Sequence, residues 1–321
     1  ILALMVTEDL AVTSMATIEL TNWDSRHLRL SWSDARLFQP GAELDIWMGY
    51  GSAPGRVFMG EIVGLEASFQ VEATPRVTVR AYDHRHRLAR GRQTRSFVKA
   101  KDSEIARVIA QQAGLAADVI DTRVTLDYVL QRNQADLAFL RERAGRLGYE
   151  VFVRDKRLQF RPPGANTRPV LQLNVASDLL EFSARYSTVG QVGEVEVHGW
   201  DIAGKQPYSA RARAGLEQRI ATGRANRAAL GTAVLHDVDT LPQNPAEATA
   251  IAQGRLDQIA LGSMQAEGRC RGRPALRAGV VAAIEGAGTT FSGNYYLTTV
   301  VHSYDLDEGY VSEFAGRRAI P

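Results

Sequence analysis

Cysteine is almost absent from this sequence, and lysine is scarce. The single cysteine, Cys270, excludes an intrachain disulfide and any metal site built from several thiolates. Its place in an alternating Gly-Arg-Cys-Arg-Gly run indicates a buried strand residue rather than a reactive thiol. Arginine far outnumbers lysine, which occurs only as Lys99, Lys101, Lys156 and Lys205. Arginine suits interfaces because its planar group binds carboxylates bidentately, and a bias toward GC-rich codons explains the excess equally well.

Long hydrophobic runs and strong net charge are also missing. No apolar stretch approaches the roughly 18 to 20 residues of a membrane span, and no signal-peptide pattern is present. The net charge of +2 gives no bulk electrostatic reason to expect binding to nucleic acid or to a membrane. The chain of 321 residues, 45% hydrophobic and 23% charged, has room for two or three globular domains.

The clearest local pattern lies in residues 128–160. Asn133 is a good helix N-cap and Asp136 suits the first turn, so we expect a helix that begins at Asn133. Its apolar stripe is formed by Leu137, Leu140, Ala144 and Leu147. Gly148 ends the helix as a left-handed residue. Alternation from 151 to 160 then predicts a β-hairpin.

Short alternating strands precede and follow this pattern. Those of residues 3–82, with turn residues between them, predict a small antiparallel barrel, and strands resume over 171–200 and from 264 to the end. The segment 204–243 is rich in Ala, Gly, Arg and Gln, and we expect an irregular surface excursion there. A helix is predicted over 245–261, because Asn244 and Pro245 suit its start.

A faint internal repeat links the two β regions. Gly41 precedes one strand and Phe58-Met59-Gly60 opens the next, just as Gly279 precedes a strand and Phe291-Ser292-Gly293 opens the next. A further strand follows each pair. We therefore predict a mainly β fold with an α+β insert, in which two similar antiparallel β-barrel domains flank a small α+β domain. The predicted domain limits are 1–96, 97–165 and 166–321.

The pattern of residues 128–148 resembles the signature of the phage late control D family. These are hub proteins of contractile tails, and the family includes the N-terminal part of the VgrG spike proteins. The matching residues are Tyr128, Gln131, Asn133, Asp136, Leu137, Phe139, Leu140, Arg143 and Gly148. The run from Gly279 to Tyr310 resembles the family's C-terminal strands, so the resemblance covers nearly the whole chain except 204–243. In the family these residues are structural, and the resemblance implies no enzyme activity, cofactor or metal.

The resemblance also implies a function and partners. The protein would be a homotrimeric hub or spike protein of a contractile injection machine, with tube-protein-like barrels arranged with pseudo-six-fold symmetry. It would adapt a hexameric, Hcp-like inner tube to a three-fold spike tip or C-terminal needle, next to other baseplate proteins. Assembly would take place in the bacterial cytoplasm, and the particle would be extracellular if released. The machine itself, a phage tail, a tailocin, an extracellular injection system or a type VI system, stays open.

Two other functions deserve comparison with this one. Asp136 and Glu142 are the carboxylates that a tail-tip peptidoglycan hydrolase would use, although helix capping and a solvated helix face also explain them. A basic stretch could bind nucleic acid, but it lacks interleaved aromatic residues. We expect these arginines to pair with carboxylates of a neighbouring subunit: Arg85, Arg87, Arg90, Arg92 and Arg95.

Three smaller patterns favour structural explanations. His84 and His86 could offer two imidazoles to a zinc ion, but no third ligand stands nearby in the sequence. The run from Gly286 to Phe291 lacks the third glycine of a phosphate loop and leads into a strand, which favours a hairpin connection. His302 has apolar neighbours and is predicted to be a core or barrel-rim residue.

Overall fold

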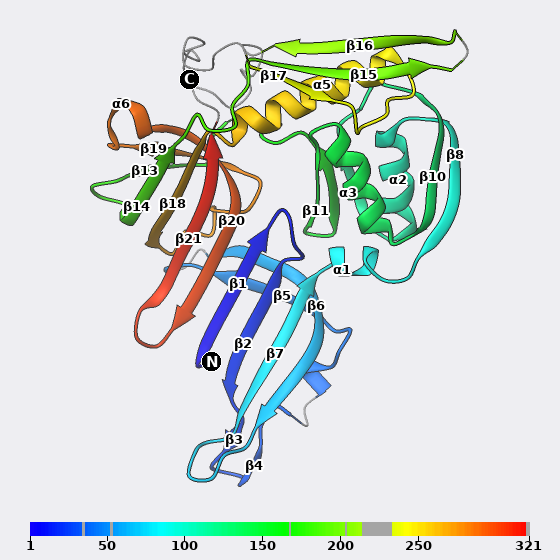
Figure 1. Ribbon diagram of the computed structural model, residues 1–321. Coiled ribbons are helices and arrows are strands. Elements are labelled where there is room, and N and C mark those ends of the chain that lie inside the picture. Colours follow the sequence, from blue (N-terminus) through cyan, green and yellow to red (C-terminus); the bar gives the residue numbers. More distant parts are fainter. Residues whose placement is uncertain (34–35, 52–53, 167, 203, 214–232, 319–321) are drawn as a thin grey trace.

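One large β-sheet organises the chain (Figure 1). The computed structural model describes the whole sequence except residues 34–35, 52–53, 167, 203, 214–232 and 319–321. The sheet has eleven strands. Nine follow the order β14-β18-β21-β20-β1-β2-β7-β6-β5, and β19 joins β20 on one side and β13 on the other. The protein is therefore mainly β with a small α+β insert, which confirms the predicted fold class.

The first β unit comprises five strands in the order β1-β2-β7-β6-β5. Alternation of apolar and polar residues explains them, as in β7, where Val77, Val79 and Ala81 are all buried. These residues join Val6 and Phe58 in one hydrophobic core. The bounds are β1 (Ala3–Asp9), β2 (Met15–Thr21), β5 (Glu43–Met48), β6 (Gly55–Ser68) and β7 (Arg76–Asp83), with β3 (Trp23–Asp24), β4 (Arg29–Leu30) and the 3-10 helix η1 (Arg36–Phe38) in the connection from β2 to β5.

The second β unit repeats this topology strand by strand. Its strands follow the order β14-β18-β21-β20-β19, and every neighbouring pair is antiparallel, as in the first unit. A separate core contains Tyr295, Val300 and Phe314. The bounds are β13 (Leu171–Asn174), β14 (Leu179–Tyr186), β18 (Met264–Arg271), β19 (Val281–Glu285), α6 (Gly288–Phe291), β20 (Gly293–Asp305) and β21 (Gly309–Arg318).

Two glycines show how closely the units agree. The amide of Gly41 donates to the carbonyl of Ile62 at 2.7 Å, and the amide of Ile62 donates back to the residue after the glycine at 2.9 Å. Gly279 and Leu297 form the same two bonds, at 2.7 and 2.9 Å. Both glycines have positive φ, +91° and +83°, a region that favours glycine. A one-residue bulge follows Ile62 in β6 and Leu297 in β20, so the weak sequence repeat corresponds to a repeated backbone geometry.

The α+β insert lies between the two units in sequence. A hydrophobic core that includes Ile109, Leu140 and Phe160 joins its helices to a two-stranded sheet, β10-β8, and a three-stranded sheet, β11-β12-β9. The short helix α1 (Arg85–Leu88) leads into it. Its elements are β8 (Gln93–Ala100), α2 (Asp102–Gln112), β9 (Ala116–Val119), β10 (Leu126–Gln134), α3 (Asp136–Arg146), β11 (Glu150–Arg154) and β12 (Arg157–Arg161). The three domain limits inferred from the sequence stay a prediction.

The expected start of the signature helix is wrong. Helix α3 begins at Asp136 after Ala135, and no side chain caps it. Asn133 instead belongs to the end of β10 and has a positive φ of 48°, a conformation that asparagine tolerates better than most residues. The same local chemistry makes asparagine suitable for an N-cap and for a left-handed strand end, so the pattern alone could not separate them.

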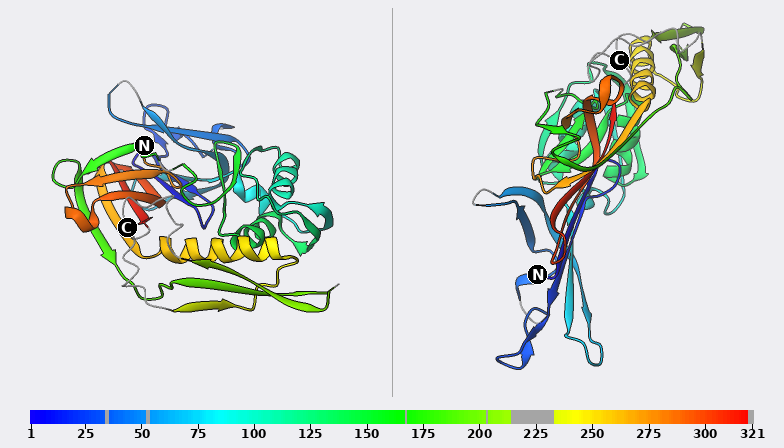
Figure 2. Two further views of the ribbon diagram at one scale, coloured as in Figure 1. Left: turned by 90° about the horizontal axis from the view of Figure 1, so that it is seen from above. Right: turned by 90° about the vertical axis from the view of Figure 1, so that its left-hand side faces the viewer.

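A second sheet and a long helix extend the second β unit. The sheet has the order β16-β15-β17, with bounds β15 (Glu194–Asp201), β16 (Gln206–Arg213) and β17 (Val234–Asp237). Helix α5 spans Pro245–Leu261, and the Asn244 side chain accepts a hydrogen bond from the Glu247 amide. In Figure 2 this helix lies along the three strands, and Ile251 and Leu256 share a core with Val195 and Val197.

The expectation of an irregular excursion at 204–243 is therefore wrong at both of its ends. Strands β16 and β17 occupy 206–213 and 234–237, whereas 214–232 lie outside the described residues. Small alanines carry the buried face of β16, with Ala210 and Ala212 packed toward α5. Their small size hid the alternation that marks a strand. Within the described part of the chain, no helix combines the length and apolar character needed to span a bilayer.

Candidate assembly interface

The two β units meet edge to edge within one chain. Strand β1 of the first unit pairs antiparallel with β20 of the second, and Val6 stands opposite His302 in this register. The joint makes one continuous sheet out of two repeats that are far apart in sequence (Figure 1). Pairing removes two open strand edges that could otherwise bind another chain. The joint thus shows one way in which these units associate.

A buried ion pair stabilises the joint. Glu8 on β1 accepts hydrogen bonds from the Arg277 Nε and Nη2 atoms at 2.6 to 2.8 Å and from the Ala278 amide at 3.1 Å. Arg277 also donates to the carbonyl of Arg56 on β6 at 2.9 Å, so the cluster connects both units. Burial opposes ionisation of Glu8, but attraction to Arg277 and these hydrogen bonds leave its pKa below the ordinary value. The sequence analysis missed this pair because its members lie 269 positions apart.

His302 lies in the same joint and has a structural role. It is fully buried, its Nδ1 lies 2.9 Å from the hydroxyls of both Ser312 and Tyr310, and its Nε2 lies 2.9 Å from the Leu276 carbonyl. Burial lowers its pKa to about 4, so the ring is neutral near pH 7. The expected core position is confirmed.

Among the strand edges that lack a partner strand in the described part of the chain, two correspond to the strands of the joint. One is β14, at the end of the large sheet. The other is the far half of β6, because β5 pairs with β6 only as far as Glu61 and the edge from Gly64 to Ser68 stays open. Exposed apolar side chains stand at both places, with Leu180 and Tyr186 55% and 40% exposed on β14 and Phe69 and Val71 60% and 94% exposed just after β6. Open edges with exposed apolar residues are typical of sites where another strand adds to a sheet.

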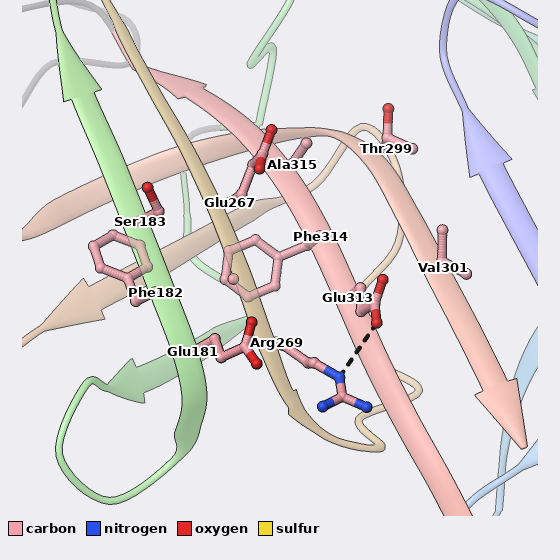
Figure 3. Close-up of a pocket in the computed structure, with 11 residues that line it drawn as sticks. Glu181, Phe182, Ser183, Glu267, Arg269, Thr299, Val301, Glu313, Phe314 and Ala315 are labelled. Carbon is pink, nitrogen blue, oxygen red and sulfur yellow. Dashed lines mark ion pairs between the residues drawn. The ribbon is translucent and has the colours of Figure 1, made fainter. Parts of the chain in front are cut away.

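A shallow hollow of about 520 Å³ lies next to the β14 edge (Figure 3). Its floor is the surface of β14, β18, β20 and β21, where the Phe314 ring packs against Gly268. Three carboxylates, those of Glu181, Glu267 and Glu313, line it together with a single arginine, Arg269, whose Nε lies 3.3 Å from the Glu313 carboxylate. The hollow therefore has an excess of negative charge and suits a basic or polar protein surface better than an anion.

Four of the five predicted interface arginines have partners within the chain. Arg85 is 1% exposed and donates to the carbonyls of Asp9 and Leu10, so the expectation that it contacts a neighbouring subunit is wrong. Its guanidinium is needed to satisfy the turn between β1 and β2. Arg87 pairs with Glu61 at 3.0 Å.

The remaining three arginines lie on the α+β insert or just before it. Arg92 donates to the carbonyl of Asn133, and Arg95 binds Gln131 and Asp136. Arg90 is exposed, and no intrachain partner is described for it. An interface role for the exposed arginines stays a prediction. Arg87 and Arg95 already bind carboxylates of their own chain.

The signature residues gather around the start of α3. Gln131 is fully buried and its amide donates to the Asp136 carboxylate at 2.8 Å, while Arg95 approaches the same carboxylate. Leu137, Phe139 and Leu140 are buried in the core of the insert. Tyr128 is about half exposed on β10. This arrangement explains part of a structural signature, because Gln131 and Asp136 are joined at the start of the helix.

The rest of the signature docks the insert. Arg143 donates from Nε to Asp102 at 2.6 Å, and its Nη2 lies 3.5 Å from Glu247 on α5. Arg146 reaches the same Glu247 carboxylate at 2.8 Å. Gly148, with φ +67°, allows α3 to end against α5, since a Cβ there would lie 2.5 Å from the Gly254 carbonyl oxygen. The signature therefore connects the insert to the second β unit.

The two carboxylates of the hydrolase hypothesis have separate structural partners. Asp136 is engaged by Arg95 and Gln131, and Glu142 accepts a hydrogen bond from the Gln134 side chain at 2.8 Å. A general acid needs an environment that raises its pKa. Asp136 is instead held in an ion pair with Arg95.

His84 and His86 have local structural roles at the end of the first unit. Both are buried at the start of α1, and the His86 Nδ1 lies 2.8 Å from the Asp83 carbonyl. Burial lowers the pKa of His84. Cys270 is also buried, which raises its pKa to about 11 and fits an unreactive thiol.

Solved structures with a similar fold include proteins of phage tails and of a secretion system. The 43 kDa tail protein of prophage MuSo2 from Shewanella oneidensis matches with a TM-score of 0.69 at 13% identity, over 99% of this chain and 94% of its own. A tail protein from Neisseria meningitidis MC58 matches with a TM-score of 0.67 at 10% identity, over 98% and 91%. The E. coli c3393 protein is a component of the type VI secretion system with structural similarity to the T4 tail proteins gp27 and gp5. It matches with a TM-score of 0.64 at 14% identity, over 99% and 73%.

The similarity to these solved structures shows a shared fold, and a match between the sequence and a family profile shows the family. No curated protein matches the chain. The narrower resemblance to the late control D and VgrG proteins stays a prediction, since the matching family profile is a different one. That profile, described as the Alg8 N-terminal domain, covers residues 1–305. The chain belongs to the Alg8 N-terminal domain family.

Proposed function

We propose that this protein is a structural hub in the baseplate of a contractile, phage tail-like machine. Three copies form a closed ring, in which six similar β units face a hexameric tube protein and the opposite side holds a three-fold spike. The observation that carries the proposal is the repeat of one five-stranded topology within the chain, with the repeats joined edge to edge. The tail proteins that share the fold support this setting. The proposal assigns no catalytic step and places assembly in the bacterial cytoplasm.

The β1–β20 joint supplies a template for the contact between chains. By topology, β1 corresponds to β14, and β20 corresponds to β6. The strands that correspond to the joined pair therefore both have open edges. A ring requires a contact between two different surfaces that repeats until it closes. Pairing of β14 with β6 of the next chain provides such a contact and reproduces the joint already present inside each chain.

The repeat also fixes the register of this contact. Matching the hydrogen-bonded neighbours of each strand aligns Val6 with Ala184 and His302 with Ala67. Since Val6 stands opposite His302 in the joint, Ala184 stands opposite Ala67 of the next chain. In this register Arg185 faces Glu66 of the next chain, a pairing of opposite charges. Opposite charges on facing strands stabilise a sheet, whereas like charges would oppose it.

The contact also accounts for the exposed apolar residues at these edges. Phe182 of one chain comes to stand opposite Phe69 of the next, and Tyr186 stands opposite Leu65. Phe69 is 60% exposed in the single chain, so this contact would remove apolar surface from water. Burial of such side chains is favourable by about 25 cal/mol for each Å² of apolar surface removed from water.

A cysteine cross-link tests the ring and its register together. Ser183→Cys combined with Ser68→Cys places two thiols directly opposite each other in the proposed contact, where Cα atoms lie about 4.5 to 5.5 Å apart. Under mild oxidation we expect covalent dimers and trimers on a non-reducing gel. The internal control is Met5→Cys with Ser303→Cys, the equivalent pair within one chain, which should form a bond without joining chains.

A second variant separates register from mere proximity. Ser183→Cys with Ala67→Cys shifts the pair by one residue, which moves the thiols to opposite faces of the sheet and should prevent efficient cross-linking. A ring that forms in solution without the Ser183–Ser68 cross-link would refute the register. Failure to form any trimer, even with the tube protein present, would refute the hub itself.

A further inference from the structure

Three potential metal ligands converge on the outer sheet, away from the proposed ring contact. Glu196 and His198 lie two residues apart on β15, so both side chains project from the same face of the strand. His236 lies on β17, the parallel neighbour, in register with Glu196. One ligand atom from each residue can be chosen such that all three lie within 4.8 Å of one another. The sequence analysis missed this cluster, because 37 residues separate His198 from His236.

The interatomic distances suit a small tetrahedral ion. The His198 Nε2 and His236 Nδ1 atoms are 3.3 Å apart, and the His236 Nδ1 atom is 3.5 Å from the nearer Glu196 oxygen. Two ligand atoms that each lie 2.0 to 2.1 Å from a tetrahedral zinc ion are about 3.4 Å apart. Two edges of the required tetrahedron are therefore already present, and the third needs a small side-chain movement.

The surroundings hold the carboxylate in a suitable orientation. Arg211 on β16 donates from Nε toward one Glu196 oxygen at 3.1 Å, whereas the other oxygen faces His236. Glu196 is 6% exposed, so it cannot swing freely into solvent. Ser209 also hydrogen-bonds the Glu196 carboxylate. Carboxylates that bind metal ions are usually held by hydrogen bonds in this way.

A simpler explanation is a surface cluster of a histidine pair and an ion pair. The imidazole rings do stack, with centroids 5.6 Å apart, and one ring nitrogen can donate to the other. In that arrangement the His236 Nδ1 atom, which carries either one proton or one lone pair, has to serve both the imidazole and the carboxylate, whereas a metal ion would bind all three ligand atoms. A single nitrogen that faces both an imidazole and a carboxylate is better explained as one corner of a three-ligand site.

We propose that Glu196, His198 and His236 bind one divalent transition-metal ion, with zinc as the ion that best fits two imidazoles and a carboxylate. The His236 side chain is 57% exposed, so a fourth position stays open to water or to a donor atom from another protein. The ion would link β15 to β17 and stabilise their pairing. This site is independent of the ring contact, because none of its residues lies on β14 or β6.

Titration of the purified full-length chain with zinc tests the site. After treatment with a chelator, we expect one zinc ion per chain by isothermal titration calorimetry, and a rise in the melting temperature as zinc is added. Cobalt in place of zinc should give the intense visible absorption of a tetrahedral complex. His236→Ala should lose the stoichiometric zinc ion, the zinc-dependent rise in melting temperature and the cobalt spectrum.

A matched control comes from another exposed histidine. His27 also contacts a carboxylate, that of Asp24, whose other ion-pair partner is Arg29 and not a further metal ligand. His27→Ala should bind zinc as the unmodified chain does. Equal zinc binding by His236→Ala and the unmodified chain would overturn the site, as would the absence of stoichiometric zinc binding in a chain whose circular dichroism shows that it is folded.

Discussion

Removal of the buried carboxylate at the joint between the β units should strongly destabilise the protein. Glu8→Gln keeps a side chain of the same shape and an acceptor for the Ala278 amide, but it leaves Arg277 without its main counter-charge. The side chains of Glu8 and Arg277 are only 9% and 12% exposed. Loss of one member of a buried ion pair costs about 3 to 5 kcal/mol.

Two charged neighbours of Arg277 determine where the loss of stability should fall between about 3 and 5 kcal/mol. Asp155 lies 3.9 Å from the Arg277 guanidinium but is 37% exposed, so it can replace only part of the lost attraction. Arg154 is also attracted to Glu8, and after the substitution its positive charge would repel Arg277 with only the partial compensation of Asp155. These effects oppose each other, and we expect a loss of about 4 kcal/mol in the free energy of unfolding.

Urea unfolding followed by circular dichroism at pH 7 measures this loss. Because the pKa of Glu8 is lowered in the folded chain, its contribution is fully present above the ordinary value of 4.5 and is lost as the pH falls through the lowered value. The difference between Glu8→Gln and the unmodified chain should therefore shrink in acid. Adding Arg277→Met should restore much of the stability, since it removes the unpaired charge.

An exposed ion pair serves as the control for this experiment. Asp127→Asn breaks the pair with Lys99, in which both side chains are more than 70% exposed, and should leave the stability nearly unchanged. A stability of Glu8→Gln within about 1 kcal/mol of the unmodified chain would refute the reasoning, because it would mean that water reaches the joint and screens Arg277.

Two further predictions concern the contacts between the insert and the second β unit. Burial raises the pKa of Glu150 to about 7, so the folded chain retains a proton that the unfolded chain loses, and stability should fall as the pH rises from about 4.5 to 7. Glu150→Gln should remove this slope and stabilise the chain at pH 8 by up to about 3 kcal/mol. Urea unfolding at a series of pH values measures both effects. A slope unchanged in Glu150→Gln would contradict this assignment. Gly254→Ala should destabilise the chain by about 1 to 3 kcal/mol, because its Cβ would lie 2.2 Å from the Leu147 carbonyl oxygen. Gly145→Ala, in the open part of α3, should instead stabilise the chain by about 0.5 to 1 kcal/mol. The two variants should therefore shift the melting temperature in opposite directions, and equal shifts would show that helix propensity alone decides both.

The sequence predicts the repeated strands well because they follow local rules. Alternation marks each strand, and the glycines that precede β5 and β19 mark the turns that need positive φ, so the faint echo between Gly41 and Gly279 led to a real correspondence. The same rules fail where one residue type suits two different local structures. Asn133 suits both a helix cap and a left-handed strand end, and the alanines of β16 conceal a strand.

The candidate interface lay beyond local rules for a different reason. Which edges stay open depends on which distant strands pair, and the β1–β20 joint brings together residues about 300 positions apart. Arginine content suggested an interface in the basic stretch, but Arg85 is required inside the chain to bind the carbonyls of Asp9 and Leu10. Composition identifies residues that can form an interface, whereas only the fold shows which of them are free to do so.

The insertions suggest how one chain can present two symmetries. In the first unit a five-residue turn joins β1 to β2, whereas the equivalent connection from β14 to β18 carries β15, β16, β17 and α5. The α+β insert docks onto this connection through Glu247, which receives Arg143 and Arg146. The long connection of the second unit and the α+β insert therefore lie toward one end of the molecule, whereas β3 and β4 of the first unit lie at the other (Figure 1). On the proposed ring, the shared strands would provide six similar positions for the tube, and the gathered insertions would provide three for the spike.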